Sequence, residues 1–169
     1  MSFGERPGDA LSPSTMTSAA IAAALSTAPQ LPALHDAVFR GDLAAVTALV
    51  TDQSCDVNEC TEQGSTPLLL AATCGHTEIT SFLLSKGAAV NQYRPSDRTT
   101  PLCAAVAAGR LDVTRVLLQH GADQSIARIS GATPLYLAAA VESSDKRTAN
   151  PAMVELLRHP PPLSNRSSE

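Results

Sequence analysis

The sequence predicts an all-α fold, a solenoid in which short helical hairpins are stacked in a row. The first observation behind this prediction is an internal repeat. Leu34, Leu68, Leu102 and Leu135 each open a run of small residues, at successive steps of 34, 34 and 33 residues. The second is the dipeptide Thr-Pro directly before the last three of these leucines, and the third is a glycine seven residues after the first three. A period of this length is typical of repeat proteins in which each copy is one supersecondary unit.

Each copy is expected to begin with a helix that a threonine caps. In the second copy the hydroxyl of Thr66 can cap the first turn, and Pro67 has the fixed φ that suits the first helical position. Gly75 permits the left-handed conformation that ends this helix. A second helix then follows, with apolar residues such as Ile79 and Leu83 on one face. The pattern predicts two short antiparallel helices per copy.

Helices of about two and a half turns are too short to be stable alone in water. Their apolar faces must therefore be covered by the neighbouring copies, and the core is a row rather than a globule. Alanine pairs such as Ala71-Ala72 and Ala104-Ala105 let the first helices of successive copies approach closely.

The repeats are expected to occupy residues 31–159, in copies that span about 31–64, 65–98, 99–131 and 132–159. Residues 1–30, rich in Ser, Thr, Ala and Pro, are expected to form a flexible tail. Residues 160–169 are expected to form a second, Pro-rich flexible tail, because three consecutive prolines cannot continue a helix.

The fourth copy departs from the pattern. Its first helix is expected to run from Pro134 to about Val141, with Glu142 where the other copies have glycine. Some six extra residues follow, and the second helix is expected to restart at Pro151 and to end at His159.

The repeat resembles the ankyrin repeat, on the evidence of the Thr-Pro-Leu runs and the glycines. The resemblance implies about four helix-turn-helix units joined by β-hairpin-like fingers, with Gly64 and Gly131 at the turns of two fingers. The finger from Val90 to Thr99 is one residue longer and has no glycine, so we expect a distorted or more mobile tip. The histidine of the family's Thr-Pro-Leu-His run is replaced by Leu69, Cys103 and Tyr136.

Composition excludes several classes of function. The net charge is −4 and the basic residues form no stripe, so nucleic acid is not an expected partner. No segment has the roughly 20 apolar residues that cross a bilayer. The four cysteines form no CxxC pair, so we expect reduced thiols, no metal site, no cofactor, and a location in the cytoplasm, the nucleus or both.

Catalysis is not expected either. The histidines fit structural positions of the repeat, and the thiol of Cys74, next to Gly75-His76, is better explained as a small residue on the surface of the stack. The sequence has no glycine-rich phosphate loop and no set of catalytic residue types in a recognisable pattern.

Protein binding is the predicted function, because stacked hairpins create a long concave surface whose residues are not needed for folding. By repeat position, the floor of this groove is assigned to Phe39, Arg40, Thr73, Cys74, Ala107, Ala108, Ala140 and Val141. The finger side is assigned to Glu62, Gln63, Ser65, Tyr93, Arg94, Ser96, Asp97, Arg98, Thr99, Ile129, Ser130 and Ala132.

Charge varies along the fingers, with acids at Asp56, Glu59 and Glu62 and arginines in the later fingers. We therefore expect an adaptor or inhibitor whose partner protein has the opposite charge order.

Two other roles stay open. The chain can be a self-associating scaffold that pairs through the end of repeat four, although a monomer is expected, or a substrate-recognition fragment of a larger ankyrin protein such as a ubiquitin-ligase adaptor. The resemblance also implies that Asn58 and Asn91 match the finger asparagines that an oxygenase hydroxylates.

Overall fold

The structure is a computed structural model, which describes residues 33–52, 55–144 and 151–163, with side-chain burial described up to Ala140 and again from Pro151. The described residues belong to one compact unit, Leu31–Glu169. Within them lie eight α-helices: α2 (Ala33–Arg40), α3 (Leu43–Thr51), α4 (Pro67–Cys74), α5 (Thr77–Ser85), α6 (Pro101–Ala107), α7 (Leu111–Gln119), α8 (Pro134–Ser144) and α9 (Pro151–Arg158).

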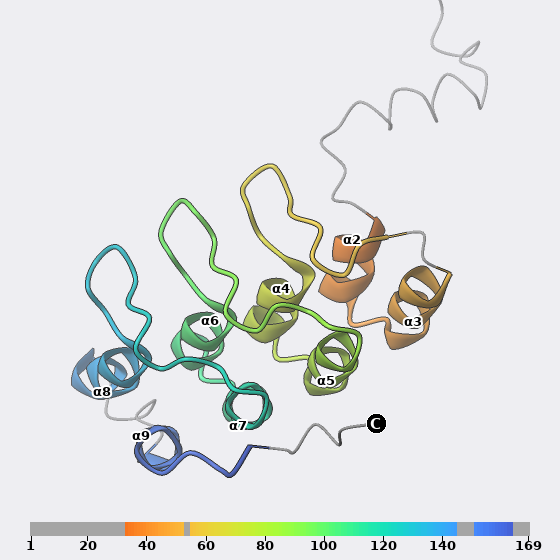
Figure 1. The fold of residues 1–169 in the computed structure, drawn as a ribbon. Helices are drawn as coiled ribbons and strands as arrows, with labels where there is room; N and C mark the ends of the chain where they lie inside the picture. The colour runs from red at the N-terminus through yellow and green to blue at the C-terminus, as the bar shows by residue number, and fades with distance from the viewer. Residues whose placement is uncertain (1–32, 53–54, 145–150, 164–169) are drawn as a thin grey trace, which may run out of the picture. The chain divides into compact units, whose positions relative to one another are not determined.

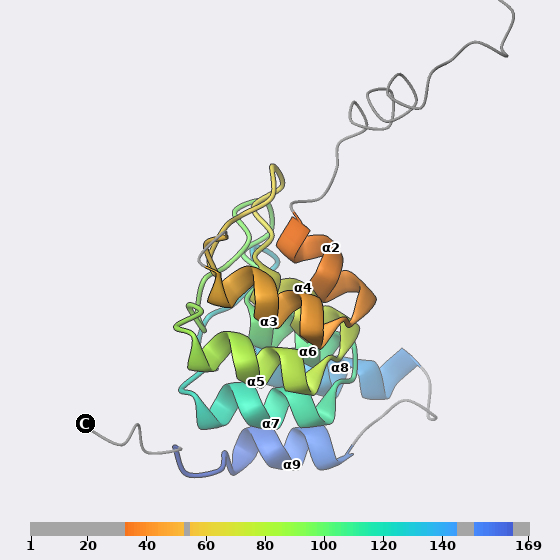
Figure 2. The same ribbon diagram turned by 90° about the vertical axis from the view of Figure 1, so that its right-hand side faces the viewer.

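The helices form four hairpins stacked side by side, which confirms the predicted all-α solenoid. The first helices of the hairpins, α2, α4, α6 and α8, follow one another in an inner row, and α3, α5, α7 and α9 make an outer row (Figures 1 and 2). Each inner helix contacts its own outer helix and the inner helices of the adjacent copies. The fingers join one hairpin to the next and project from one side of the rows (Figure 1).

The predicted caps are present. The hydroxyl of Thr66 accepts a hydrogen bond from the backbone N–H of Leu69 at 3.1 Å, and that of Thr100 accepts one from Cys103 at 3.2 Å. Gly75 ends α4 in the left-handed conformation, with φ of 89°. The Thr-Pro dipeptide and the glycine thus define the two ends of the inner helix.

The core runs along the row between the two layers. The leucines that open the inner helices of the first three copies, Leu34, Leu68 and Leu102, are buried, and so are Leu83 and Leu117 of the outer helices. Since these leucines belong to one apolar cluster that includes residues of all four copies, the apolar surface of each hairpin is covered by its neighbours in the stack.

Polar side chains also connect successive copies. The buried ring of His35 lies with Nε2 2.9 Å from the backbone oxygen of Ser65, in the next copy. The side-chain oxygen of Asn58 accepts a hydrogen bond from the backbone N–H of Ala89 at 2.8 Å. Side chains of one copy are therefore paired with backbone groups of the next copy.

The fourth copy differs from its neighbours as the sequence indicated, but its inner helix is longer than expected. Helix α8 continues to Ser144 rather than ending near Val141, because no glycine interrupts it. Helix α9 begins at Pro151 as predicted and ends at Arg158. Residues 145–150 and the two predicted tails, apart from residues 160–163, lie outside the described residues.

None of the described helices has both the length and the apolar character needed to cross a membrane.

Candidate protein-binding surface

The exposed side of the inner row has a repeating position. Phe39 in α2, Thr73 in α4 and Ala107 in α6 occupy the same place in their copies, and all three are exposed, Phe39 to 59%. The residue directly before each of them is buried, because successive helical residues point about 100° apart. These side chains point away from the core, which frees them to contact a partner. Ala140, the matching residue of α8, is half-buried.

The next position of the inner helices is more varied. Arg40 is exposed and forms an ion pair with Asp36 at 2.7 Å, while Ala108 is exposed and Cys74 is half-buried. Burial raises the pKa of the Cys74 thiol, and the positive charge of Arg110 only partly opposes this effect. The thiol is therefore neutral at pH 7, which argues against a nucleophile at this position. The side chain of Val141 lies outside the described residues.

Three fingers close on similar backbone hydrogen bonds. Finger one is residues 61–65, finger two 94–99 and finger three 128–132. The N–H of the first residue donates to the carbonyl of the last at 3.0, 2.9 and 3.0 Å respectively. Their exposed tips contain Glu62 and Gln63 in finger one, Ser96 and Arg98 in finger two, and Ile129 and Ser130 in finger three.

Finger two keeps this closure without a glycine. Its turn has one residue more, and Arg98 takes the left-handed backbone conformation, with φ of 56°, that Gly64 and Gly131 take in the other fingers. An ion pair supports the turn, since Arg94 donates two hydrogen bonds to Asp97 at 3.0 and 2.6 Å. The longer tip is therefore a wider version of the same turn, held by side chains, rather than an open loop.

Asp97 is the centre of this support. Its carboxylate also accepts hydrogen bonds from the backbone N–H of Thr99 at 3.1 Å and from the Thr99 hydroxyl at 2.5 Å. The guanidinium of Arg94 and these hydrogen bonds hold the pKa of Asp97 well below its usual range. The carboxylate is ionised at neutral pH and neutralises Arg94, whereas Arg98 forms no ion pair with any residue that the structure describes.

The fingers contact one another along the row. The backbone N–H of Ile129 donates a hydrogen bond to the carbonyl of Asp97 at 3.0 Å. Finger one packs on finger two, because a Cβ placed on Gly64 would lie only 2.5 Å from Cδ of Pro95. The fingers therefore present one connected surface.

Two large apolar side chains are exposed on the finger segments. Tyr93, 45% exposed, lies under the guanidinium of Arg98, whose central carbon is 5.5 Å from the ring centroid. Ile129, 66% exposed, stands at the tip of finger three. An aromatic ring with a stacked arginine is a combination common at the centre of protein interfaces.

Two residues assigned to the finger side do not face outward. Thr99 and Ala132 are both buried, because the last residue of each finger turns inward where the next inner helix begins. Ser65 is half-buried, and its backbone carbonyl pairs with His35. These three residues support the fingers, and Thr99 and Ala132 are corrected to structural positions.

The two finger asparagines have structural roles. The side-chain oxygen of Asn91 accepts a hydrogen bond from Asp123 at 2.8 Å, as that of Asn58 does from Ala89. Both asparagines are half-buried. Their place in the sequence is explained by the connection between copies, and hydroxylation at either of them stays a prediction.

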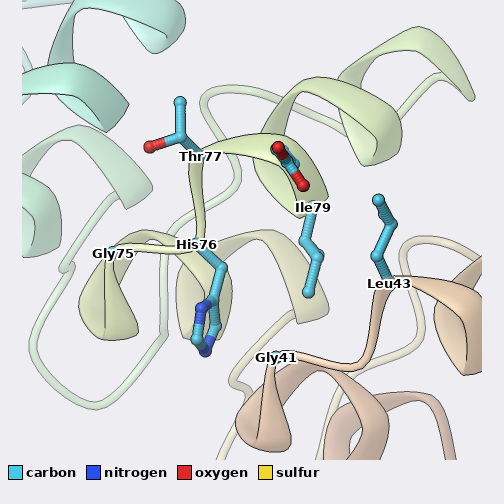
Figure 3. Close-up of a pocket in the computed structure, with 7 residues that line it drawn as sticks. Gly41, Leu43, Gly75, His76, Thr77 and Ile79 are labelled. Atoms are coloured by element: carbon cyan, nitrogen blue, oxygen red, sulfur yellow. The ribbon is translucent and has the colours of Figure 1, made fainter.

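A cavity lies at the turns between the paired helices, where Gly41 follows Arg40 and Gly75 follows Cys74. It has a volume of about 250 Å³ and is lined by Gly41, Leu43, Gly75, His76, Thr77, Glu78 and Ile79 (Figure 3). The ring of His76 lies against Gly41, where a Cβ would be 2.7 Å from Cε1. His76 thus fills the space that the glycine leaves. No group of three potential metal ligands occurs among the described residues.

Sequence comparison shows which family the chain belongs to. The family model for ankyrin repeats in three copies matches residues 34–128, more than half of the 169 residues. Together with the four stacked hairpins, this match shows that the chain belongs to the ankyrin repeat family. Ankyrin repeats are protein-interaction modules.

The chain is similar to parts of several known proteins. It is 40% identical over 65 residues to ankyrin repeat and SOCS box protein 1 of Homo sapiens, which is 34% of this chain and 19% of that protein. It is 41% identical over 58 residues to human protein phosphatase 1 regulatory subunit 27, and this match covers 34% of this chain and 37% of that protein. It is 42% identical over 53 residues to the human NAD-capped RNA hydrolase NUDT12, and this match covers 31% of this chain and 12% of that protein. The matches cover between 12% and 37% of these relatives, so they carry the repeat and not a whole protein's activity.

Proposed function

We propose that this chain binds another protein, without chemical change, through the exposed inner-helix positions and the finger tips. One observation carries the proposal: the large apolar residues Phe39, Tyr93 and Ile129 are exposed to 59%, 45% and 66% on the inner-helix and finger positions. Large exposed apolar groups on a soluble surface mark interaction sites when they gather in one region. Family membership supports the same class of function.

The charges on the surface suggest the chemistry of the partner. Glu62 in finger one is exposed, and Asp56 and Glu59 lie in the same segment. Arg98 in finger two is exposed, and Arg128 begins finger three. A partner segment that is basic beside finger one and acidic beside fingers two and three would bind faster and in one register.

We further propose an adaptor or inhibitor role in the cytoplasm, the nucleus or both. One relative is named as a regulatory subunit of a phosphatase, which supports a role of this type. The alternative is that the chain is the substrate-recognition part of a larger ankyrin protein, such as a ubiquitin-ligase adaptor. The similarity to a relative named for ankyrin repeats and a SOCS box supports this alternative.

The proposal is tested by quantitative affinity capture from a cell extract with three forms of the chain. The first is unaltered, and the second combines Phe39→Ser, Arg40→Ser and Tyr93→Ser. The third is a matched control in which the exposed outer-row residues Glu78, Lys86 and Arg115 are changed to serine.

A true partner should be recovered with the unaltered chain and the outer-row control, and about tenfold less with the second form, because hot-spot residues dominate binding. Equal recovery with all three forms would place the binding site on another surface. Circular dichroism checks that helix content is the same in each form.

A further inference from the structure

The two ends of the described stack differ in polarity. In the first three copies, three matching inner-helix positions are all buried: Leu34, His35, Val38, Leu68, Leu69, Ala72, Leu102, Cys103 and Val106. At one of these positions His35 contacts Ser65 of the next copy. In the fourth copy the same positions of α8 are held by Leu135, Tyr136 and Ala139, here called the α8 end face. Leu135 is 40% exposed, Tyr136 is 64% exposed, and Ala139 is exposed.

The α8 end face continues an established interface. Helix α6 packs on α8, and Leu102, Cys103 and Val106, at the same three positions of α6, are buried, so residue types suited to helix packing are present at these positions of α8 as well. A terminal repeat normally has a polar outer face, which keeps the stack soluble. The apolar α8 end face therefore needs an occupant.

The other end of the described stack, formed by the first copy, does not fit the α8 end face. The inner-helix position that faces the preceding copy is Leu70, Ala104 and Leu137 in copies two to four, but Asp36 in the first copy. Asp36 is held in an ion pair with Arg40 at 2.7 Å. Docking this end on the α8 end face would bury the ion pair against apolar side chains, a cost that the attraction of the two charges does not repay.

A further hairpin stacked in register does not fit well either. Arg158 of α9 takes the position of Leu84 and Leu118, which are buried between copies in α5 and α7. Pro160, Pro161 and Pro162 follow instead of the Gly-Ala-Asp turn that begins the finger after α7. The occupant must cover α8 while the arginine on α9 stays in water.

We propose that this occupant is a second copy of the chain, which pairs through the α8 end face across a two-fold axis. In an isologous contact the same patch meets itself, so apolar groups face apolar groups and neither end ion pair is buried. Ala139 lets the two α8 helices approach closely. When the two-fold axis lies between the two α8 helices and parallel to them, the two α9 helices fall on opposite sides of the contact. The Arg158 side chains then stay apart. The contact closes on itself, so it gives a dimer and no filament.

The contact is small. One helix face buries less than the roughly 1,200 Å² of a standard interface, so we expect a weak association that depends on concentration. Sedimentation velocity between about 10 µM and 1 mM should show the average mass rising from 17.5 kDa toward twice that value. Tyr136→Glu should weaken this association at least about tenfold, and Tyr136→Phe should leave it nearly unchanged. The matched control Tyr93→Glu, an exposed tyrosine on a finger segment, should also leave it unchanged.

A mixture of Tyr136→Glu and Tyr136→Lys should restore association, since opposite charges then face each other across the axis. A mass that stays at one chain, or that grows beyond two, would overturn the proposal. Equal loss with Tyr93→Glu, or no recovery in the mixture, would overturn it too. If the mass stays at one chain and Tyr136 is nitrated more slowly than Tyr93, another part of the same chain is the occupant.

Discussion

Fingers one and two make the same turn by different means. Finger one has Gly64 at its left-handed residue. It is closed by backbone hydrogen bonds and by the Thr61 hydroxyl, which accepts a hydrogen bond from the N–H of Ser65. Finger two has Arg98 at that residue, one residue more, and the ion pair between Arg94 and Asp97. A non-glycine residue in this conformation costs free energy, which the surrounding contacts must supply.

The difference between the two fingers shows that side chains determine the exposed surface of finger two. In finger two the support leaves Arg98 and the neighbouring Tyr93 held together on the exposed side. A glycine at position 98 would close the turn with less strain but would remove this pair. The strained residue thus coincides with the surface proposed to bind a partner.

The largest difference in stability between the two fingers is expected when Asp97 is removed. Asp97→Ala removes the ion pair and leaves the buried hydroxyl and the N–H of Thr99 without their acceptor. We expect a loss of about 2 kcal/mol in the free energy of unfolding, measured by urea denaturation. Finger one has no such group, so Glu62→Ala is the matched control and should change stability by less than about 0.5 kcal/mol. Similar losses for both would show that finger two does not depend on its side chains.

The next largest effect concerns the glycine fingers. Gly64→Ala places a Cβ on a residue with φ of 76° and against Pro95, so it should destabilise the chain by about 1 to 2 kcal/mol. Gly131→Ala has a similar φ of 79° but meets nothing within 4 Å, so it should cost only about 1 kcal/mol. Thermal melts of the two variants measure the difference. An equal loss would mean that fingers one and two do not pack as described.

Acid should weaken finger two selectively. Because the pKa of Asp97 is lowered in the folded state, its ionised form stabilises the fold at every pH above the unfolded value of about 3.9. This contribution is lost as the pH falls below that value toward the folded pKa. Between pH 5 and pH 3 the unaltered chain should therefore lose more stability than Asp97→Asn, by less than about 1 kcal/mol because the pair is partly in water. Parallel pH profiles of the two proteins would contradict the assignment.

The smallest effect has the opposite sign. Arg98→Gly relieves the left-handed strain and should stabilise the chain by about 0.5 to 1 kcal/mol, measured by urea denaturation. It should also weaken binding of a partner recovered by capture, since the guanidinium over Tyr93 is lost. A variant that is less stable would show that contacts of the Arg98 side chain outweigh the backbone strain.

Regular features of the fold were predictable from the sequence because they depend on local chemistry. Thr66 and Pro67 fix the start of α4, and Gly75 fixes its end. The extra length of α8 was not predicted, since the absence of a glycine shows that a helix can continue but not where it stops.

Features of the site were predictable only in part. Repeat position predicted the exposure of Phe39 and Thr73, because every copy uses the same face for packing. It could not show that Thr99 turns inward or that Asp97 supports the finger, since these depend on contacts within an irregular segment. Repeat position alone could not show that Tyr136 is exposed, since the matching residues His35, Leu69 and Cys103 of the earlier copies are buried.

Hydrogen–deuterium exchange of the chain with a captured partner, compared with the chain alone, tests the central claim most directly. The claim is that the partner lies on the inner-row and finger surface. We predict slower exchange in fingers one to three and in the inner helices α2, α4 and α6, with no change in α3, α5 and α7. Protection confined to the outer helices would contradict the claim.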